Sequence, residues 1–394
     1  METPREAVIG KEFDEIVSFA RDLSLDRDLS AVREWKAAKP GRIAIGAFPV
    51  YVPTELIQAA GALPVWLFGG GGAVDISHAD SRIQSFVCSI SRSTLELGLR
   101  GHLRVLDGVV FPSVCDVARN LSGIWARNFP AMFMEFLHLP QNRESESAIA
   151  YLVAEYRRLL GGLERITGCP LEEDALRNAI RSHNENRVAA EALLDLRRTT
   201  PWALDAWENY ALLHGGAVLE REEHTRLLRT AFEAARRRDR KPKDRVRVLV
   251  LGAFCEQPPL ELVRTIEEAG CYILEDDLLQ GLHWFRNPIP ADGDPLSALA
   301  TAYVRHSPQS SVSHYRGTPR QDLLVQRCRE LGAAGVVFCT AKFCEPALYD
   351  QVLYKERLEA AQIPYVHIEF EEKMSAFDTT RTQVETFVES ILFE

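Results

Sequence analysis

The chain of 394 residues lacks the long apolar stretches that mark membrane proteins. No run approaches the roughly 20 consecutive apolar residues that a membrane-spanning helix needs. The N-terminal stretch METPREAVIGKEFDEIV mixes charged and apolar residues, unlike a secretory signal peptide. We therefore expect a cytoplasmic protein without a membrane partner. Because thiols stay reduced in the cytoplasm, we expect the eight cysteines to be core residues or cofactor ligands, not disulfides.

Signatures of several common functions are also missing. A net charge of -10 argues against a general nucleic-acid binder. The chain has no G-x-x-x-x-G-K-[ST] motif for ATP phosphates, no G-x-S-x-G motif of serine hydrolases and no zinc-like histidine spacing. It has no Cys-x-x-Cys pair either, so a metal site would have to be assembled from distant segments.

What the chain does contain is a pattern that occurs twice. Residues 42–69 read RIAIGAFPVYVPTELIQAAGALPVWLFG, and residues 245–274 read RVRVLVLGAFCEQPPLELVRTIEEAGCYIL. Each stretch has an apolar strand, Gly-Ala-Phe, a helix that begins near Pro-x-Glu, and a second strand. We interpret this pattern as a duplicated βαβ unit, which predicts a parallel sheet in each half of the chain.

A second echo follows in the same order. GVVFPSVCD at 108–116 and GVVFCTAKFCEP at 335–346 both run Gly-Val-Val-Phe and soon reach a cysteine. Between the halves the sequence is helical in character from 145 to 235, and the basic run ARRRDRKPKDR that follows is expected to be a solvated linker, the alternative being a contact with an acidic partner.

The expected fold class is therefore α/β. Two similar Rossmann- or flavodoxin-like domains would turn their parallel sheets toward one cleft, and an all-helical segment would bridge them. The expected boundaries are 1–40 for N-terminal helices, 41–140 for the first α/β domain, 141–245 for the helical bridge and linker, and 246–394 for the second α/β domain.

Three cysteines are candidates for one binding site. Cys115 and Cys344 follow strand ends, where open parallel sheets bind their ligands. Cys88, in QSFVCSISRSTLELG, lies at the expected start of a helix, whose dipole favours a thiolate. Three thiolates from distant segments suit an iron–sulfur cluster with one open iron, although the residues alone also permit inert cysteines. Cys255 follows a strand end too and is a possible extra ligand, whereas the remaining cysteines are expected to be structural: Cys169, Cys271, Cys328 and Cys339.

These motifs resemble a known family over nearly the whole chain. GAFPVYVPTELIQAAGALPV, SFVCSISRS, LDGVVFPSVCDVARN and GVVFCTAKFCEPALYD follow the order of the core subunits of the benzoyl-CoA reductase/2-hydroxyacyl-CoA dehydratase family. Within it, the 44.3 kDa size and the run VCDVARNLSGIWARNFP are most similar to the C-type core subunits of ATP-dependent benzoyl-CoA reductases. The resemblance implies one [4Fe-4S] cluster on Cys88, Cys115 and Cys344.

The resemblance also implies partners and an activity. The partners would be a second related core subunit, an iron–sulfur ATPase activator, ferredoxin as electron donor, and benzoyl-CoA or another acyl-CoA. The implied enzyme is an oxidoreductase acting on CH–CH groups, which reduces benzoyl-CoA to a cyclohexadiene carboxyl-CoA in anaerobic aromatic degradation. The alternatives are a subunit of a 2-hydroxyacyl-CoA dehydratase, an electron-relay subunit without a substrate site, and a homodimeric relative with a double-cubane cluster.

Glu55 is the candidate catalytic residue. The resemblance places it where a dehydratase subunit of the family has an acidic residue near the substrate, so that it would donate a proton or orient the substrate. A carboxylate in the first turn of a helix is also stabilised by the helix dipole alone, and the echo at Glu261 favours that structural role. Asp116 has two similar interpretations, as a hydrogen-bonding group near the cluster or as a cap of the next helix. The GGGG run at 69–72 lacks the dinucleotide-binding spacing and is expected to be a strand-exit loop or a phosphate contact.

Overall fold

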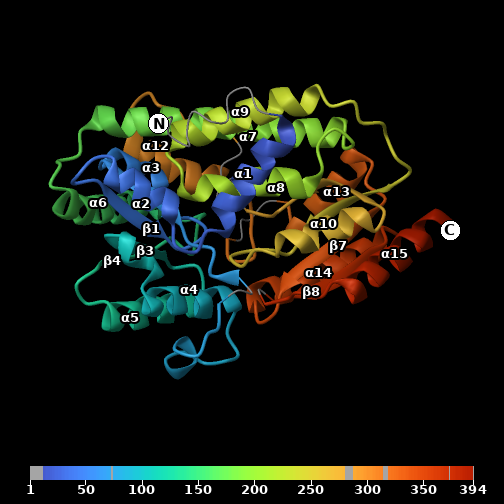
Figure 1. Cartoon of the computed structure of the whole chain (residues 1–394), viewed down its shortest axis with the longest axis horizontal. Helices are drawn as coiled ribbons and strands as arrows, with labels where there is room; N and C mark the ends of the chain where they lie inside the picture. Colours follow the sequence, from blue (N-terminus) through green and yellow to red (C-terminus); the bar gives the residue numbers. More distant parts are fainter. Residues whose placement is uncertain (1–11, 72–73, 280–286, 314–317, 372, 394) are drawn as a thin grey trace.

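The computed structural model describes residues 12–71, 74–279, 287–313, 318–371 and 373–393 (Figure 1). Residues 1–11 of the expected N-terminal helices and Gly72 of the glycine run lie outside this part. The described residues form two four-stranded parallel sheets surrounded by helices. Within the same residues, no helix is long and apolar enough to cross a membrane.

The first half of the chain builds one of the two sheets. Its elements are α1 (Phe13–Leu25), α2 (Ser30–Ala37), β1 (Ile43–Ala47), α3 (Thr54–Ala59), β2 (Ala62–Trp66), α4 (Ser89–Arg100), β3 (Gly108–Pro112), α5 (Asp116–Asn128) and β4 (Phe133–Leu137). The strand order is β2-β1-β3-β4. Every residue of β2 and β3 is buried, as expected for short apolar runs in a parallel sheet that is covered on both faces.

The last part of the chain builds the other sheet. Its elements are β5 (Val246–Leu251), α10 (Leu260–Glu268), β6 (Cys271–Asp276), α12 (Pro295–Thr301), α13 (Arg320–Leu331), β7 (Gly335–Ala341), α14 (Glu345–Ala360), β8 (Tyr365–Phe370) and α15 (Asp378–Phe393). The strand order is β6-β5-β7-β8.

The two sheets have the same topology and nearly the same register. β3 begins opposite Ile45, the third residue of β1, and β7 begins opposite Val248, the third residue of β5. The segments around Gly46 and Gly252 therefore occupy equivalent places in their sheets. This confirms the α/β fold class with two similar domains. The strand order switches direction between the neighbouring strands β1 and β3 in the first sheet, and between β5 and β7 in the second. Open α/β folds bind their ligands outside the carboxyl ends of the strands at such a switch point.

Four long helices connect the halves, which confirms the helical character predicted for residues 145–235. They are α6 (Ala148–Thr167), α7 (Glu173–Thr199), α8 (Ala206–Gly215) and α9 (Arg221–Arg236). Figure 1 shows α7 and α9 along the top of the view, across both halves. Helix α7 contacts α3 of the first half and β6 of the second, so the bridge is packed onto both sheets.

The apolar cores do not follow the order of the chain. Helix α1, at the N-terminus, buries Phe13, Ile16 and Val17 in the core of the second half. Helix α12 buries Leu296 and Leu299 in the core of the first half. Each half thus contributes a helix to the core of the other, which holds the two sheets together. The expected domain boundaries stay a prediction.

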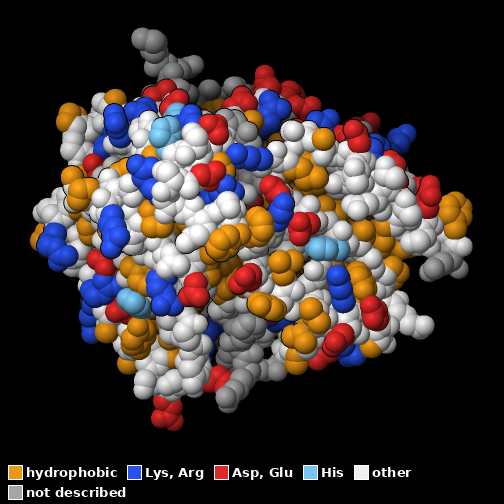
Figure 2. All heavy atoms as spheres, turned by 90° about the horizontal axis from the view of Figure 1, so that it is seen from below, with side chains coloured by type: hydrophobic (Ala, Val, Ile, Leu, Met, Phe, Trp, Pro, Cys, Tyr) orange, Lys and Arg blue, Asp and Glu red, His pale blue; other side chains and the backbone are white. Residues whose placement is uncertain are grey.

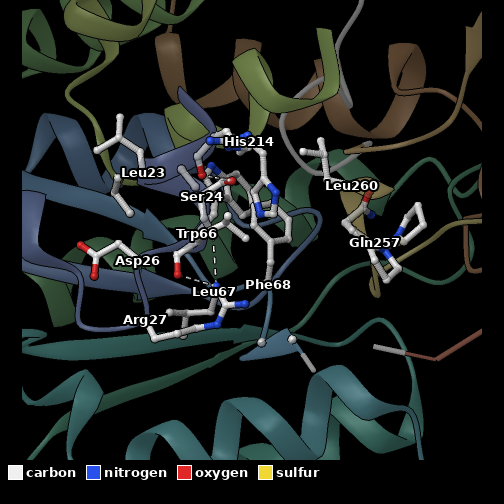
Figure 3. A pocket seen from close by; sticks show the side chains of 18 of the residues that line it. Leu23, Ser24, Asp26, Arg27, Trp66, Leu67, Phe68, His214, Gln257 and Leu260 are labelled. Carbon is white, nitrogen blue, oxygen red and sulfur yellow. Dashed lines mark hydrogen bonds between the residues drawn. The ribbon is translucent and has the colours of Figure 1, made fainter. Parts of the chain in front are cut away.

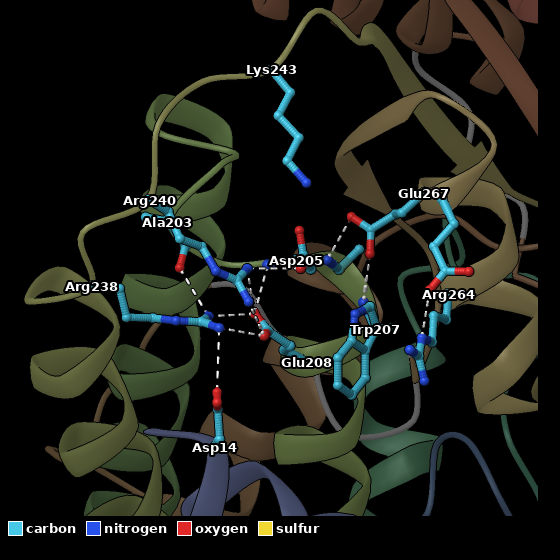
Figure 4. Close-up of polar contacts among 12 residues, drawn as sticks. Asp14, Ala203, Asp205, Trp207, Glu208, Arg238, Arg240, Lys243, Arg264 and Glu267 are labelled. Carbon is cyan, nitrogen blue, oxygen red and sulfur yellow. Dashed lines mark hydrogen bonds and ion pairs between the residues drawn. The ribbon is translucent and has the colours of Figure 1, made fainter. Parts of the chain in front are cut away.

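The basic run before β5 is largely exposed, as expected of a solvated linker, but two of its arginines are not solvated. Figure 4 shows Arg238 and Arg240 turned toward Glu208 of α8, at nitrogen–oxygen distances of 2.7 and 2.9 Å. Arg240 also pairs with Asp205 at 2.8 Å. The prediction of a solvated linker is wrong for these two residues because their acidic partners lie in the same chain, on the start of α8, which the local sequence does not reveal.

Candidate functional site

Two of the candidate cysteines lie where a central strand passes into a helix. β3 ends at Pro112, and Cys115 is the N-cap of α5, its Sγ accepting a hydrogen bond from the Ala118 N–H at 3.5 Å. In the second half, β7 ends and Cys344 is the N-cap of α14. Both thiols are partly buried. They therefore lie at the carboxyl edges of their sheets, as predicted.

The third candidate has the same local setting. Cys88 is the N-cap of α4, as the sequence predicts, and its Sγ lies 3.2 Å from Ser91 Oγ. The N-cap position of Cys115 and Cys344 was not foreseen, although each is followed by an acidic residue and a helical run. All three cysteines thus meet the positive end of a helix dipole, which stabilises a thiolate.

The three thiols influence one another's pKa, which indicates that they lie in one neighbourhood. Burial, aided by the charges of Glu256, Cys115 and Cys344, raises the pKa of the Cys88 thiol. Burial likewise raises the pKa of Cys344 to about 12, with Cys115 and Glu256 adding to the shift. Each thiol is therefore within electrostatic range of the others, although they come from segments more than 25 positions apart in the sequence.

Cys255 belongs to the same electrostatic neighbourhood. It is buried, and its Sγ lies 4.0 Å from the Pro49 carbonyl oxygen. Burial raises its pKa, and Cys115, Cys344 and Cys88 raise it further. Its place beside the candidate trio agrees with its prediction as an extra ligand or near neighbour. Three of the remaining cysteines are buried in strands or a helix, as expected of core residues: Cys271, Cys328 and Cys339. Cys169 is exposed, and its structural role stays a prediction.

Among the described residues, no group of three or more His, Cys, Asp or Glu side chains is arranged to hold a metal ion. The assignment of a [4Fe-4S] cluster to Cys88, Cys115 and Cys344 therefore stays a prediction. Sulfurs that share one cubane bind different irons and are held roughly 6–7 Å apart, given metal–thiolate bonds a little over 2 Å long. Burial keeps these thiols protonated in the free chain, so the binding of iron would release their protons. Each of the three thiols lies at a helix N-terminus, which would stabilise the thiolate formed when iron replaces the proton.

Glu55 lies in a different, buried polar cluster. Its carboxylate forms an ion pair with Arg187 of α7, and its Oε2 has no hydrogen-bond partner within the described residues. Burial acts to raise its pKa, but His183, Arg187 and Arg221 together hold it below the ordinary value. The structure therefore joins Glu55 to the helical bridge. Its catalytic role stays a prediction.

Asp116 and Glu256 each follow a cysteine directly in the sequence, but they differ in their exposure to water. The Asp116 side chain is 86% exposed and pairs with Arg119 at 2.9 Å on the surface of α5. Glu256, which follows Cys255, is only 3% exposed and lies among the thiols. Sequence reasoning did not single out Glu256. The signal was its position in GAFCEQP directly after a strand end.

A cavity of about 570 Å³ is lined by the end of α1 and the loop after it, by the segment after β2, by α4 and α8, and by Gln257, two positions after Cys255. None of the candidate cysteines lines it. Figure 3 shows the side chains of Trp66, Phe68 and His214 gathered in it. The His214 ring meets Phe68 edge-on at 4.7 Å. Burial lowers the pKa of His214 to about 4, so its imidazole is neutral at physiological pH. Cavities of this volume and largely apolar lining are typical of small-molecule sites.

Comparison with known proteins agrees with this arrangement. Residues 49–391 match the family described as 2-hydroxyglutaryl-CoA dehydratase, D-component. The chain is 38% identical over 379 residues to the C-type subunit of benzoyl-CoA reductase from Thauera aromatica, covering 96% of this chain and 98% of the relative. It is 30% identical over 364 residues to lactoyl-CoA dehydratase subunit beta of Anaerotignum propionicum, covering 92% and 95%. It is 27% identical over 359 residues to (R)-2-hydroxyglutaryl-CoA dehydratase, subunit beta, of Acidaminococcus fermentans, covering 89% and 93%. These matches confirm the resemblance inferred from the sequence.

Proposed function

The chain belongs to the 2-hydroxyglutaryl-CoA dehydratase D-component family, and on that premise we propose that it is a core subunit of an ATP-dependent, ferredoxin-linked benzoyl-CoA reductase. The enzyme would reduce the ring of benzoyl-CoA to a cyclohexadiene carboxyl-CoA in the cytoplasm. The similarity to a benzoyl-CoA reductase subunit over nearly the full length of both chains supports this choice.

In this proposal Cys88, Cys115 and Cys344 hold a [4Fe-4S] cluster. The observation that supports it is that three cysteines from both halves are each the N-cap of a helix and act electrostatically on one another. The cluster would supply single electrons at low potential. The chain itself would contribute thiolates stabilised by helix dipoles. The three cysteines are partly buried against the apolar core of the first half, which would limit the loss of electrons to protons of water.

The proposal includes partners that the chain does not itself provide. They are a second related core subunit, an iron–sulfur ATPase activator, ferredoxin and an acyl-CoA. Exposed aromatic side chains beside the cysteines support a protein contact there: Phe86 is 68% exposed two positions before Cys88, and Phe343 is exposed next to Cys344. On the face in Figure 2, hydrophobic side chains are interspersed with charged ones of both signs, a mixture that suits a protein partner better than a nucleic acid.

The cavity that contains Trp66, Phe68 and His214 supports the proposal that this chain binds a small-molecule substrate. Its ring-lined, mostly apolar wall and the neutral His214 suit an uncharged acyl group with one hydrogen-bonding oxygen. Binding of benzoyl-CoA to the full chain, measured by calorimetry against coenzyme A alone, bears on the alternative of an electron-relay subunit. An affinity that does not depend on the benzoyl group would favour that alternative.

The decisive experiment is anaerobic purification with the partner subunits, followed by iron and sulfide analysis, electron paramagnetic resonance and a benzoyl-CoA assay. Replacing Cys88, Cys115 or Cys344 by serine should remove the cluster signal and ring reduction. Cys328→Ser is the matched control, because Cys328 is an equally small thiol buried in α13, and it should leave both intact. A cluster signal that survives in any of the three variants would contradict the ligand assignment, and Cys255→Ser would be examined next.

The similarity to dehydratase beta subunits supports a second candidate function. A 2-hydroxyacyl-CoA dehydratase would use the same cysteines but return its electron after each turnover. Counting electrons separates the two functions: a reductase consumes two from ferredoxin for every ring reduced, whereas a dehydratase consumes none in the steady state. Turnover of a 2-hydroxyacyl-CoA without electron consumption would replace the proposed reaction.

A further inference from the structure

A carboxylate of the second half caps a helix of the first half at the cysteine site. Glu256 lies in the loop after β5 and is almost completely buried. Its Oε2 accepts a hydrogen bond from the Ile90 N–H at 3.2 Å. Ile90 lies in the first turn of α4, whose N-cap is Cys88. Glu256 therefore satisfies a backbone donor that the helix itself leaves open, and it does so across the boundary between the two halves.

The same carboxylate lies among the thiols. Its charge contributes to raising the pKa of Cys88, Cys255 and Cys344, after the larger effect of burial. These cysteines come from α4, from the loop after β5 and from the start of α14. Glu256 is thus within electrostatic range of groups from both halves.

Two other acids near the cysteines are in contact with water. Asp116 is largely exposed at the start of α5 and pairs with Arg119, and Glu345 is exposed at the start of α14. Water and salt screen an exposed charge, whereas a charge held in a poorly polarisable interior acts strongly on its neighbours. Asp116 also acts on the Cys115 thiol, but its charge is exposed to water, so Glu256 should have the larger effect on the site.

We propose that Glu256 is a positioning residue that fixes the Cys88 end of α4 to the second half, and that its buried negative charge lowers the reduction potential of the group bound by the cysteines. The second part rests on the proposed [4Fe-4S] cluster. Because an added electron is repelled by a fixed neighbouring charge, the reduced state of a cluster beside a carboxylate is less favourable. A low potential is what the reduction of an aromatic ring demands of an electron donor.

Two substitutions separate the hydrogen bond from the charge. Glu256→Gln keeps a carbonyl oxygen that can accept from the Ile90 N–H but removes the charge. Glu256→Ala removes both. Asp116→Asn is the matched control, because it deletes an acid next to another cysteine whose charge is exposed to water.

The charge is tested by redox titration of the purified complex, monitored by electron paramagnetic resonance. Glu256→Gln should raise the reduction potential, and Asp116→Asn should raise it less. A Glu256→Gln complex with the potential of the wild type, or a larger shift in Asp116→Asn, overturns the electrostatic part of the proposal.

The positioning part is tested on the full chain without metal, by hydrogen exchange at the Ile90 amide. Loss of a helix cap should speed exchange by about three- to thirtyfold in Glu256→Ala, whereas Glu256→Gln should stay close to the wild type. Unchanged exchange in Glu256→Ala overturns this part. If iron and sulfide are absent from the wild-type complex, the proposed function fails, but the exchange experiment still decides whether Glu256 anchors α4.

Discussion

The two α/β halves share one topology, and in each of them a buried glutamate contacts the helical bridge. The two glutamates differ in the direction of their pKa shifts. In the first half, Glu55 of α3 pairs with Arg187 of α7. Burial acts to raise the pKa of Glu55, but the neighbouring cations lower it. In the second half, Glu267 of the equivalent helix α10 accepts hydrogen bonds from the N–H groups of Ala206 and Trp207, at 2.8 and 3.1 Å, where α8 begins. Burial, together with the charge of Asp205, raises the pKa of Glu267 to about 8.

The difference shows that duplication conserved the scaffold but not its electrostatics. A guanidinium group keeps a buried carboxylate charged, because the attraction offsets the loss of hydration. At Glu267, burial and the like charge of Asp205 outweigh the two backbone N–H groups, so the carboxyl group keeps its proton. In both halves the helix of the bridge, and not the sheet, determines the charge. A carboxylate held in its charged form is a weak proton donor at neutral pH, so the described state favours a structural role for Glu55.

The largest effect is expected from removing the Glu55 carboxylate, which pairs with Arg187 of the bridge. Glu55→Ala leaves Arg187 buried without the carboxylate it binds, and the loss of one partner of a buried pair costs about 3–5 kcal/mol. Thermal unfolding of the full chain measures this. Because the pKa of Glu55 is lowered in the folded protein, its contribution is fully present above the ordinary value of 4.5 and is lost as the pH falls below it. The variant should therefore lose less stability in acid than the wild type. A variant that unfolds like the wild type but has lost activity would instead support the catalytic role.

A smaller effect is expected from the glycines that begin β3 and β7. A Cβ at Gly108 would lie 2.8 Å from the Phe133 carbonyl oxygen, on the backbone of the neighbouring strand. A Cβ at Gly335 would lie 2.6 Å from the end of the Phe387 ring, and no closer than 3.1 Å to backbone. Since a ring can shift but a paired strand cannot, Gly108→Ala should cost about 1–3 kcal/mol and Gly335→Ala less. Denaturant unfolding of both variants tests this. An equal cost would show that Phe387, which lies in α15, cannot move away from the added methyl group.

The contribution of Glu267 to stability should depend on pH. With its pKa raised to about 8, Glu267 contributes stability that is fully present below its ordinary value of 4.5 and is lost as the pH rises through about 8. Glu267→Gln does not titrate, so its melting temperature relative to the wild type should rise between about pH 5 and 8 and then level off. Thermal melts across that range measure the trend. A difference that stays flat with pH would mean that Glu267 is charged in the folded protein.

The sequence predicted the features that depend on local pattern. The repeated strand–Gly-Ala-Phe–helix pattern placed Gly46 and Gly252 at equivalent positions, and the helix start at Cys88 followed from its neighbours. What it did not predict depends on contacts between distant segments. Periodicity shows that one face of α1 must be buried, but not that it is buried in the core of the other half. The pairing of Arg238 with Glu208 and the capping of α4 by Glu256 are of the same kind, because no local rule states which helix end an acid will reach.

The smallest effect is expected at Glu261, the sequence echo of Glu55. Both lie in the first turn of their helices, but the Glu261 side chain is 57% exposed and its cation, Arg264, is 3.9 Å away, whereas the Glu55 side chain is 2% exposed. An exposed ion pair contributes little, so Glu261→Ala should change the free energy of unfolding by less than about 0.5 kcal/mol. This variant is the matched control for Glu55→Ala, because both remove a carboxylate from the same place in a duplicated unit. If the two variants proved equally destabilising, the helix dipole common to both sites would explain the effect, and the ion pair with Arg187 would not be the anchor of the first half.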